Sequence, residues 1–205
     1  MHTYSLNDFL RKFLCVFHRK TSSFLCLNYR RIKTLLYLKK WNVIIGKNVS
    51  FRGYIQNISI AKDLNVYSNC SFELNPDAIL NIGESCLFSY GVIISCSNKI
   101  IIGDFVQIGE YTSLRDSTHN YSDIDIPMKF QKDISGEILI GNDVWIGRNC
   151  IIMAGSVIED GVIVGANSLV KGRLKKNGIY AGTPIKLIKM RKSEETYDKI
   201  ITKQN

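Results

Sequence analysis

The sequence contains little of several residue types that mark common protein classes. Of its 205 residues only 3 are proline, against 15 glycines, which favours turns built from glycine and asparagine. It has 3 histidines, and its 6 cysteines include no C-x-x-C pair or zinc-ligand spacing, so no metal site is expected. Because no run of 18 apolar residues occurs, no transmembrane helix is predicted. Without a signal-peptide core, we expect reduced thiols and a cytoplasmic protein.

Charge is unevenly distributed along the chain, whose formal net charge is +9. Residues 1–40 contain nine bases against one acid, and residues 171–192 contain eight against none. Residues 41–170 contain eight bases and fourteen acids, so the body of the chain is acidic. The two basic segments therefore need separate explanations. No nucleic-acid-binding motif accompanies either of them, and we expect no nucleic acid as a partner.

The clearest pattern is an aliphatic or aromatic residue at every sixth position. The longest run is Ile140, Ile146, Ile152, Ile158, Val164 and Val170. Shorter runs are Ile60, Val66 and Phe72, then Ile82, Phe88 and Ile94, then Ile102, Ile108 and Leu114. The fifth place of each hexad is small or β-branched, and Cys70, Cys86 and Cys150 occupy it.

A period of six fits neither a helix nor an alternating strand. It indicates a short strand plus a turn, with every sixth side chain filling a narrow interior. Stacked coils of this kind form a solenoid of parallel sheets. The sequence therefore predicts an all-β solenoid, in which the three cysteines are core residues rather than reactive thiols.

Two stretches carry a family resemblance: "IGNDVWIGRNCIIMAGSVIEDGVIVGANSLVKG" at 140–172 and "YAGTPIKLIKMR" at 180–191. They resemble the hexapeptide-repeat acyltransferases, and the resemblance extends over about residues 43–192. It implies a left-handed parallel β-helix with three hexads per coil, assembled as a homotrimer. The left hand rests on the resemblance alone, because parallel crossovers are nearly always right-handed. We expect the β-helix over 43–178 and a C-terminal segment with a short helix over 179–205.

The repeat is interrupted in the middle of the chain. Asn120 stands where an aliphatic residue is due, and the pattern resumes at Ile140, so residues 120–139 are predicted to form an inserted arm. A loop of this length in a compact domain is usually functional or disordered, and its apolar side chains favour docking on a neighbouring subunit. His119, the only histidine in residues 19–205, lies at the root of this arm.

Imidazole is the side chain best suited to remove a hydroxyl proton near neutral pH. In the resembled family a histidine before the arm is the general base, which implies that role for His119. Because no cysteine stands beside His119 in the sequence, direct transfer to the acceptor is favoured over an acyl-enzyme. A carboxylate or carbonyl on the other ring nitrogen would fix the tautomer of His119, with Asp116 as first candidate and Asp123 as second. The resemblance also implies that Trp145 packs beside the histidine, one coil away. An aromatic plug on the trimer interface is the alternative role for Trp145, and both roles are compatible. Tyr121 and Asp123 are further candidates for contacting the substrate.

Coenzyme A carries a pyrophosphate and a 3′-phosphate, so its site should be cationic at one end. By resemblance, the pantetheine arm of acetyl-CoA would lie in the groove between two β-helices, and the nucleotide would meet basic residues. The contacts implied for pantetheine are Arg148, Ala154, Gly155 and Ala166, and those for the nucleotide are Lys171, Lys186 and Lys189. This sequence departs from the family, which often has Thr-Lys at 171–172 and Arg at 186 and 189. The alternative to a nucleotide site is that these basic residues lie on a solvated cationic helix.

Residues 5–40 mix Leu, Phe and Tyr with nine bases, which is typical of amphipathic helices. We expect a basic helical segment over residues 1–42. It could seal the open end of the solenoid, or lie on anionic lipid as a peripheral membrane contact.

The sequence as a whole favours an acetyl-CoA-dependent O-acetyltransferase without a metal. "THNYSDIDIP" at 118–127 resembles the loop of the branch that acetylates a sugar hydroxyl of a surface polysaccharide, such as a capsule or lipopolysaccharide O-antigen. One alternative is an N-acetyltransferase of a nucleotide-linked amino sugar, and another is a non-catalytic β-helical binding or assembly protein. A metal-dependent hydratase would need several histidines.

Overall fold

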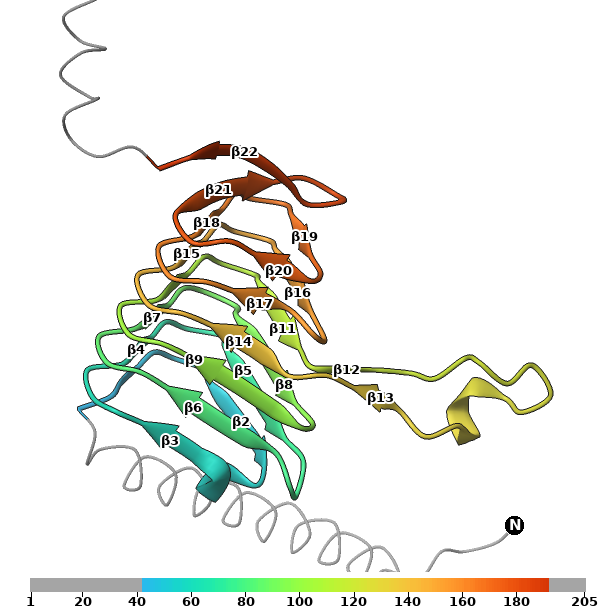
Figure 1. The fold of residues 1–205 in the computed structure, drawn as a ribbon. Helices are drawn as coiled ribbons and strands as arrows, with labels where there is room; N and C mark the ends of the chain where they lie inside the picture. Colours follow the sequence, from blue (N-terminus) through green and yellow to red (C-terminus); the bar gives the residue numbers. More distant parts are fainter. Residues whose placement is uncertain (1–41, 192–205) are drawn as a thin grey trace, which may run out of the picture. The chain divides into compact units, whose positions relative to one another are not determined.

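Three short strands and three corners make up each coil of the chain, and successive coils stack in parallel as a three-sided solenoid (Figure 1). The computed structural model describes residues 42–191, so the helical segment expected over 1–42 lies outside the described residues except for its last position. The parallel solenoid predicted from the hexads is confirmed, and its hand stays a prediction from the family resemblance.

The three sheets run the length of the solenoid and are numbered in the order in which the chain visits them. The first sheet contains β1 (Ile44–Ile45), β4 (Asn65–Val66), β7 (Leu87–Phe88), β10 (Gln107–Ile108), β15 (Trp145–Ile146), β18 (Ile163–Val164), β21 (Gly178–Ala181) and β22 (Lys186–Met190). The second contains β2 (Ser50–Gly53), β5 (Ser71–Leu74), β8 (Ile93–Cys96), β11 (Ser113–Arg115), β16 (Ile151–Met153) and β19 (Leu169–Val170). The third contains β3 (Ile58–Ile60), β6 (Ile79–Ile82), β9 (Lys99–Ile102), β14 (Ile138–Ile140), β17 (Val157–Ile158) and β20 (Arg173–Leu174).

The interior is filled by the side chains that the hexad pattern selects. In the second sheet, for example, Phe72, Ile94, Leu114 and Ile152 are in register across four coils, and each is at most 1% exposed. The six residues from Ile140 to Val170 are at most 3% exposed. Removing this apolar surface from water is the main stabilising contribution, and the parallel ladders satisfy the backbone polar groups.

The corners are named by the sheets that they join: the first corner joins the first and second sheets, the second corner joins the second and third, and the third corner joins the third and first. At the first corner the left-handed backbone positions are held mostly by Asn or Gly, as at Asn69, Gly91, Asn149 and Asn167. Asn tolerates positive φ better than most residues, and Gly does so freely. The glycine and asparagine content noted in the sequence is thus used at the corners.

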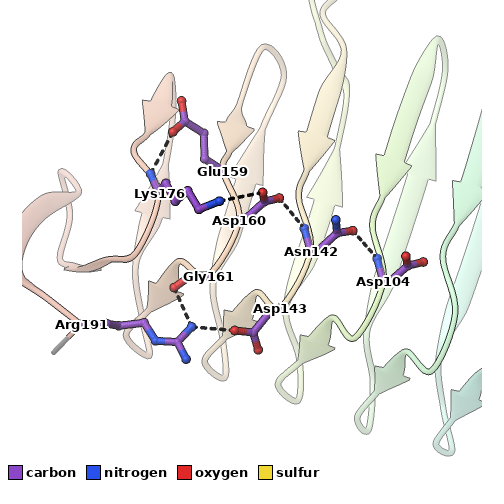
Figure 2. Close-up of polar contacts among 8 residues, drawn as sticks. All are labelled: Asp104, Asn142, Asp143, Glu159, Asp160, Gly161, Lys176 and Arg191. Atoms are coloured by element: carbon purple, nitrogen blue, oxygen red, sulfur yellow. Dashed lines mark hydrogen bonds and ion pairs between the residues drawn. The ribbon is translucent and has the colours of Figure 1, made fainter. Parts of the chain in front are cut away.

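The third corner carries a ladder of polar side chains (Figure 2). Oδ1 of Asp160 accepts the backbone N–H of Asn142, and Oδ1 of Asn142 accepts that of Asp104, at 2.9 and 2.8 Å. Lys176 donates its Nζ to Asp160 and its backbone N–H to Glu159. Because each side chain satisfies an N–H of the coil below, the ladder ties successive coils together.

The arm leaves the solenoid at the second corner as a narrow hairpin (Figure 1). β12 (Ser117–Thr118) pairs antiparallel with β13 (Ile134–Ser135), and the tip contains the short 3₁₀ helix η2 (Met128–Phe130). A second 3₁₀ helix, η1 (Ile55–Asn57), precedes β3. The hairpin begins before residue 120 and ends before 139, so it is shifted towards the N-terminus of the predicted insertion. The arm has to end before residue 138, because β14 (Ile138–Ile140) already pairs within the third sheet. The pairing of β12 with β13 therefore starts and ends earlier in the sequence than predicted.

The described C-terminal part, residues 179–191, is a strand pair rather than a helix. β21 extends the first sheet in parallel, and β22 adds to it in antiparallel orientation. Arg191 then bonds to Asp143 and to the carbonyl of Gly161, both at 2.9 Å (Figure 2). The strand pair therefore covers the C-terminal edge of the first sheet. Residues 192–205 lie outside the described residues.

None of the helices within residues 42–191 is long and apolar enough to cross a membrane.

Candidate active site

His119 lies directly after β12, where the arm leaves the solenoid, and its partner comes from the other side of the hairpin. Nδ1 of His119 is 2.9 Å from Oδ1 of Asp133, which directly precedes β13. A carboxylate oxygen can only accept, so this contact keeps the proton on Nδ1 and leaves the lone pair on Nε2. The pairing of β12 with β13 brings the two side chains together.

The pair opens onto a shallow cavity on the arm. This cavity, about 550 Å³ in volume, is lined by His119, Met128, Lys129, Gln131 and Asp133. The imidazole is 80% exposed, so within the described chain nothing covers the free Nε2. The site has a candidate base with a defined tautomer, and one open side.

The structure contradicts the prediction that Asp116 orients His119. Asp116 is fully buried, and its carboxylate accepts the backbone N–H groups of Ser97, Asn98 and Lys99 at 2.7–2.8 Å. It also lies 3.5 Å from the thiol of Cys96. Asp116 therefore holds the corner of the coil below, because three N–H donors there have no other acceptor of this strength.

Tyr121 and Asp123, predicted to contact the substrate, lie further out on the arm. Tyr121 is 72% exposed. The backbone of Asp123 exchanges hydrogen bonds with the amide of Gln131, and its Oδ1 accepts the N–H of Asp125 at 2.9 Å. Asp123 thus shapes the tip of the arm, and within the described chain it makes no contact with His119.

Trp145 lies on a different side of the solenoid from His119. It is on β15 in the first sheet, in register with Gln107 and Ile163, and it is 55% exposed. The expectation that it stacks beside His119 in the same chain is wrong, because the arm leaves from the second corner. The alternative of an aromatic plug between subunits is compatible with its exposure.

A second cavity, about 410 Å³ in volume, surrounds Trp145. Its lining comes from the first sheet and the first corner: Gly109, Glu110, Trp145, Gly147, Arg148, Ile163, Val164, Gly165 and Ala166. A Cβ added to Gly147 would come within 2.7 Å of the backbone N of Ala166, so glycine is required for this close stacking. Arg148, whose Nε is 3.9 Å from Glu110, supplies an exposed cation to the lining of the cavity.

The residues predicted to hold coenzyme A fall into two groups. Arg148 and Ala166 line the cavity around Trp145. Ala154, Gly155 and Lys171 follow strands of the second sheet, so they belong to the second corner, above the root of the arm. A Cβ added to Gly155 would meet no atom of the chain within 4 Å, so the backbone is open there. The two groups lie on different edges of the solenoid.

Lys186 and Lys189 stand on β22, at the C-terminal end of the first sheet. Trp145, Ile163, Ile179 and Lys189 are successive register partners, so Lys189 belongs to the same row of the first sheet as Trp145. All residues of β22 are exposed. These lysines therefore supply positive charge at one end of the cavity that contains Trp145.

The four cysteines among the described residues are buried. Desolvation raises the pKa of Cys86 to about 11. Burial, assisted by the neighbouring Asp116 carboxylate, raises that of Cys96 to about 12. Burial also raises the pKa of Cys70 and Cys150. Such thiols are poor nucleophiles at neutral pH, in agreement with the core role predicted for Cys70, Cys86 and Cys150.

The described residues contain no group of three or more His, Cys, Asp or Glu side chains that could hold a metal ion.

Sequence reasoning missed Asp133 and Glu110. Asp133 follows the apolar part of the arm by only a few residues. The available signal was its position: His119 stands where the arm begins, and Asp133 is a carboxylate near the place where the arm ends. Glu110 had no signal beyond its position one coil before Arg148.

Known proteins resemble this chain in both sequence and fold. The family model described as bacterial transferase hexapeptide (six repeats) matches residues 137–172. The putative lipopolysaccharide biosynthesis O-acetyl transferase WbbJ of Escherichia coli strain K12 is 30% identical over 157 residues, which cover 60% of this chain and 80% of WbbJ. A chloramphenicol acetyltransferase of Morganella morganii is 31% identical over 163 residues, covering 77% of this chain and 72% of that protein.

Among solved structures, AntD, an N-acyltransferase from Bacillus cereus, superposes with a TM-score of 0.62 at 26% identity, covering 82% of this chain and 94% of AntD. The parallel solenoid, the hexads and these similarities agree. The chain belongs to the hexapeptide-repeat acyltransferases, and it is an acyltransferase.

Proposed function

We propose that this protein is an acetyl-CoA-dependent O-acetyltransferase that acetylates a sugar hydroxyl of a surface polysaccharide, with His119 as general base. The observation that carries this proposal is the contact between His119 and Asp133. In the neutral ring it assigns the proton to Nδ1 and leaves Nε2 as the acceptor, and the two residues line an open cavity, which is an arrangement that suits general-base catalysis.

In the proposed reaction the acceptor oxygen attacks the carbonyl carbon of the acetyl thioester while its proton passes to Nε2 of His119. The new C–O bond forms a tetrahedral oxyanion, which backbone N–H groups can stabilise. The C–S bond then breaks, and the departing thiolate of coenzyme A takes the proton from the imidazolium. Asp133 stabilises that imidazolium and keeps the ring in one orientation.

The complete site is proposed to lie between two copies of the chain in a homotrimer. His119, Gly155 and Lys171 belong to the second corner, whereas Trp145 and Arg148 belong to the first sheet and first corner. If the second corner of one copy faces the first sheet of its neighbour, the open side of His119 meets the cavity of Trp145. The exposed apolar arm residues Ile124, Met128 and Phe130 favour such packing.

Acetyl-CoA is the proposed donor, with its nucleotide towards Lys186 and Lys189 and its pantetheine arm along Arg148 and Ala166. The structure of AntD in complex with 3-hydroxybutyryl-CoA supports an acyl-CoA donor. The similarity to WbbJ, described as a lipopolysaccharide biosynthesis O-acetyl transferase, supports a saccharide acceptor. The nine bases in residues 1–40 would suit a peripheral contact with the inner face of a membrane.

An N-acyltransferase of a nucleotide-linked amino sugar is the second candidate, and the similarity to AntD, an N-acyltransferase crystallised with dTDP, favours it. The two functions differ in the bond formed. Mild alkali cleaves an ester and leaves an amide intact.

The test is transfer from radiolabelled acetyl-CoA to a panel of sugars and nucleotide-linked amino sugars, followed by mild alkali and mass spectrometry. The proposal expects alkali-labile product, with His119→Ala lowering kcat about 10²- to 10⁴-fold while the oligomer persists. Asp125→Asn, which removes a carboxylate elsewhere on the arm, is the matched control. Alkali-stable product, or an active His119→Ala variant, would overturn the proposal.

A further inference from the structure

Three exposed tyrosines occupy the first corner in three consecutive coils. Tyr67, Tyr90 and Tyr111 follow β4, β7 and β10, and they are 41%, 50% and 60% exposed. They take the first, second and third positions after their strands, so they form an oblique stripe across the corner. This set is called the tyrosine stripe below.

Two rings of the tyrosine stripe are in contact, and the third lies against the backbone of the corner. Tyr67 and Tyr90 meet edge to face with their centroids 5.1 Å apart. The ring of Tyr111 lies over Gly91, where an added Cβ would come within 2.6 Å of its Cδ1. The backbone N–H of Tyr111 bonds to the carbonyl of Tyr90 at 2.8 Å. The three tyrosines therefore occupy neighbouring coils of one corner, with Tyr111 beside the backbone that carries Tyr90.

The stripe is continuous with the cavity that contains Trp145. Glu110, the residue before Tyr111, lines that cavity together with Arg148, and the N–H of Asn149 bonds to the carbonyl of Glu110 at 2.8 Å. The stripe leaves the cavity on the N-terminal side, whereas Lys186 and Lys189 stand at its C-terminal end. A donor bound towards the lysines would leave the N-terminal side free for the acceptor.

We infer that the tyrosine stripe is a binding track for the sugar units of an extended saccharide acceptor, next to the unit that is acetylated. This inference rests on the proposed function and specifies its substrate as an oligosaccharide or polysaccharide rather than a single sugar. The face of a pyranose presents C–H groups, which pack on the electron-rich face of a tyrosine ring. Its hydroxyls can bond to phenolic O–H groups, and the phenolic O–H groups of the three tyrosines have no hydrogen-bond partner within residues 42–191.

The surroundings of the stripe suit a saccharide. Its neighbours at the corner are polar or charged, namely Ser68, Asn69, Ser89 and Glu110. Such groups can exchange hydrogen bonds with the hydroxyls of a sugar. Neighbouring coils are about 4.8 Å apart, which is close to the length of one sugar unit, so an extended glycan can follow the rings from coil to coil.

Phe105 supplies a matched control for Tyr111. Both are aromatic, are more than half exposed and have positive φ, at 59° and 60°. Phe105 stands at the third corner, away from the stripe. Asn holds the equivalent place in other coils, as at Asn149 and Asn177, so Tyr111→Asn and Phe105→Asn should both fold. Tyr90→Ala provides a second test within the stripe.

The experiment measures transfer from acetyl-CoA to mono- and tetrasaccharides of glucose, galactose and N-acetylglucosamine, with the oligomeric state checked by light scattering. Tyr90→Ala and Tyr111→Asn are expected to raise KM for a tetrasaccharide about tenfold, with kcat and KM for acetyl-CoA unchanged, and Phe105→Asn should have no effect. An unchanged KM for the tetrasaccharide, or dissociation of both tyrosine variants but not of Phe105→Asn, would overturn the inference. Wild-type protein that acetylates no sugar would overturn the proposed function, and this inference with it.

Discussion

Oδ1 of Asp133 lies 2.9 Å from Nδ1 of His119, although the two residues are fourteen positions apart in the sequence. The contact exists because β12 and β13 pair as antiparallel strands, which brings the two ends of the arm side by side. It defines which nitrogen of the imidazole is free. The site therefore depends on the geometry of the hairpin as well as on the histidine itself.

Replacing Asp133 by Asn should lower kcat at least about tenfold, because an amide can donate to Nδ1 and so stabilise the wrong tautomer of His119. The KM for acetyl-CoA should not change, since Asp133 does not line the cavity around Trp145. Steady-state kinetics separate the two parameters, and Asp125→Asn controls for loss of charge on the arm. Equal kcat values for wild type and Asp133→Asn would show that the contact has no role in positioning.

Asp116→Asn tests the structural role of the buried carboxylate. The amide of Asn would present a donor to one or two of the three N–H groups that Asp116 now satisfies. Leaving a buried donor unpaired costs about 1–3 kcal/mol, so the free energy of unfolding should fall by about that amount in urea denaturation. Asp77→Asn, at an exposed position, is the control. Unchanged stability together with a loss of kcat comparable to that of His119→Ala would return Asp116 to the catalytic residues.

The carboxylates of the third corner should make stability depend on pH in the acid range. The pKa of Asp160 is lowered from 3.8, first by the N–H of Asn142 and then by Lys176. The N–H of Lys176 and the guanidinium of Arg173 lower that of Glu159 from 4.5. A lowered pKa in the folded state gives stability that is present above the unfolded value and is lost as pH falls through the folded value.

Asp160→Asn should therefore be less stable than wild type at pH 7, and the difference should vanish below the usual aspartate range. Asn still accepts the N–H of Asn142, as Asn142 itself does for Asp104, so the variant removes the titration and keeps the ladder. Thermal unfolding of both proteins from pH 7 to pH 2.5 measures the difference. A difference that stays constant over this range would contradict the assigned cause.

The buried thiols should not react in the folded protein. With Cys15 and Cys26 replaced by Ser, the remaining cysteines should be modified by the reagent DTNB only on unfolding, because their thiolates are disfavoured by burial. Absorbance at the thionitrobenzoate band follows the reaction. Rapid modification of Cys96 or Cys150 under native conditions would show that one of these thiols is accessible, and would reopen an acyl-enzyme mechanism.

The sequence predicted the interior of the solenoid because each hexad position acts locally. Every sixth residue from Ile140 to Val170 points inward whatever the rest of the chain does, and the strand-and-turn period alone defines the column. The broken period likewise indicated the arm, and it placed His119 at its root. These features need only the spacing of residues along the chain.

The partners of the site residues could not be predicted in the same way. Closeness in sequence suggests that Asp116 orients His119. Its carboxylate oxygens instead accept the backbone N–H groups of the preceding coil, from Ser97 to Lys99. Trp145 was expected beside His119, because one coil was assumed to stack directly on the next. The arm instead leaves at the second corner, so the two residues lie on different sides. Such relationships depend on which corner carries the insertion.

The central claim is that His119 of one copy and Trp145 of its neighbour act in the same cleft, and subunit mixing tests it most directly. His119→Ala and Trp145→Asp, each inactive alone, would be co-expressed with different tags and the mixed trimers purified through both tags. A cleft between copies predicts recovered activity, because one of the three clefts in every mixed trimer combines wild-type His119 with wild-type Trp145. Mixed trimers as inactive as either parent would place both residues in a site within one chain and contradict the account.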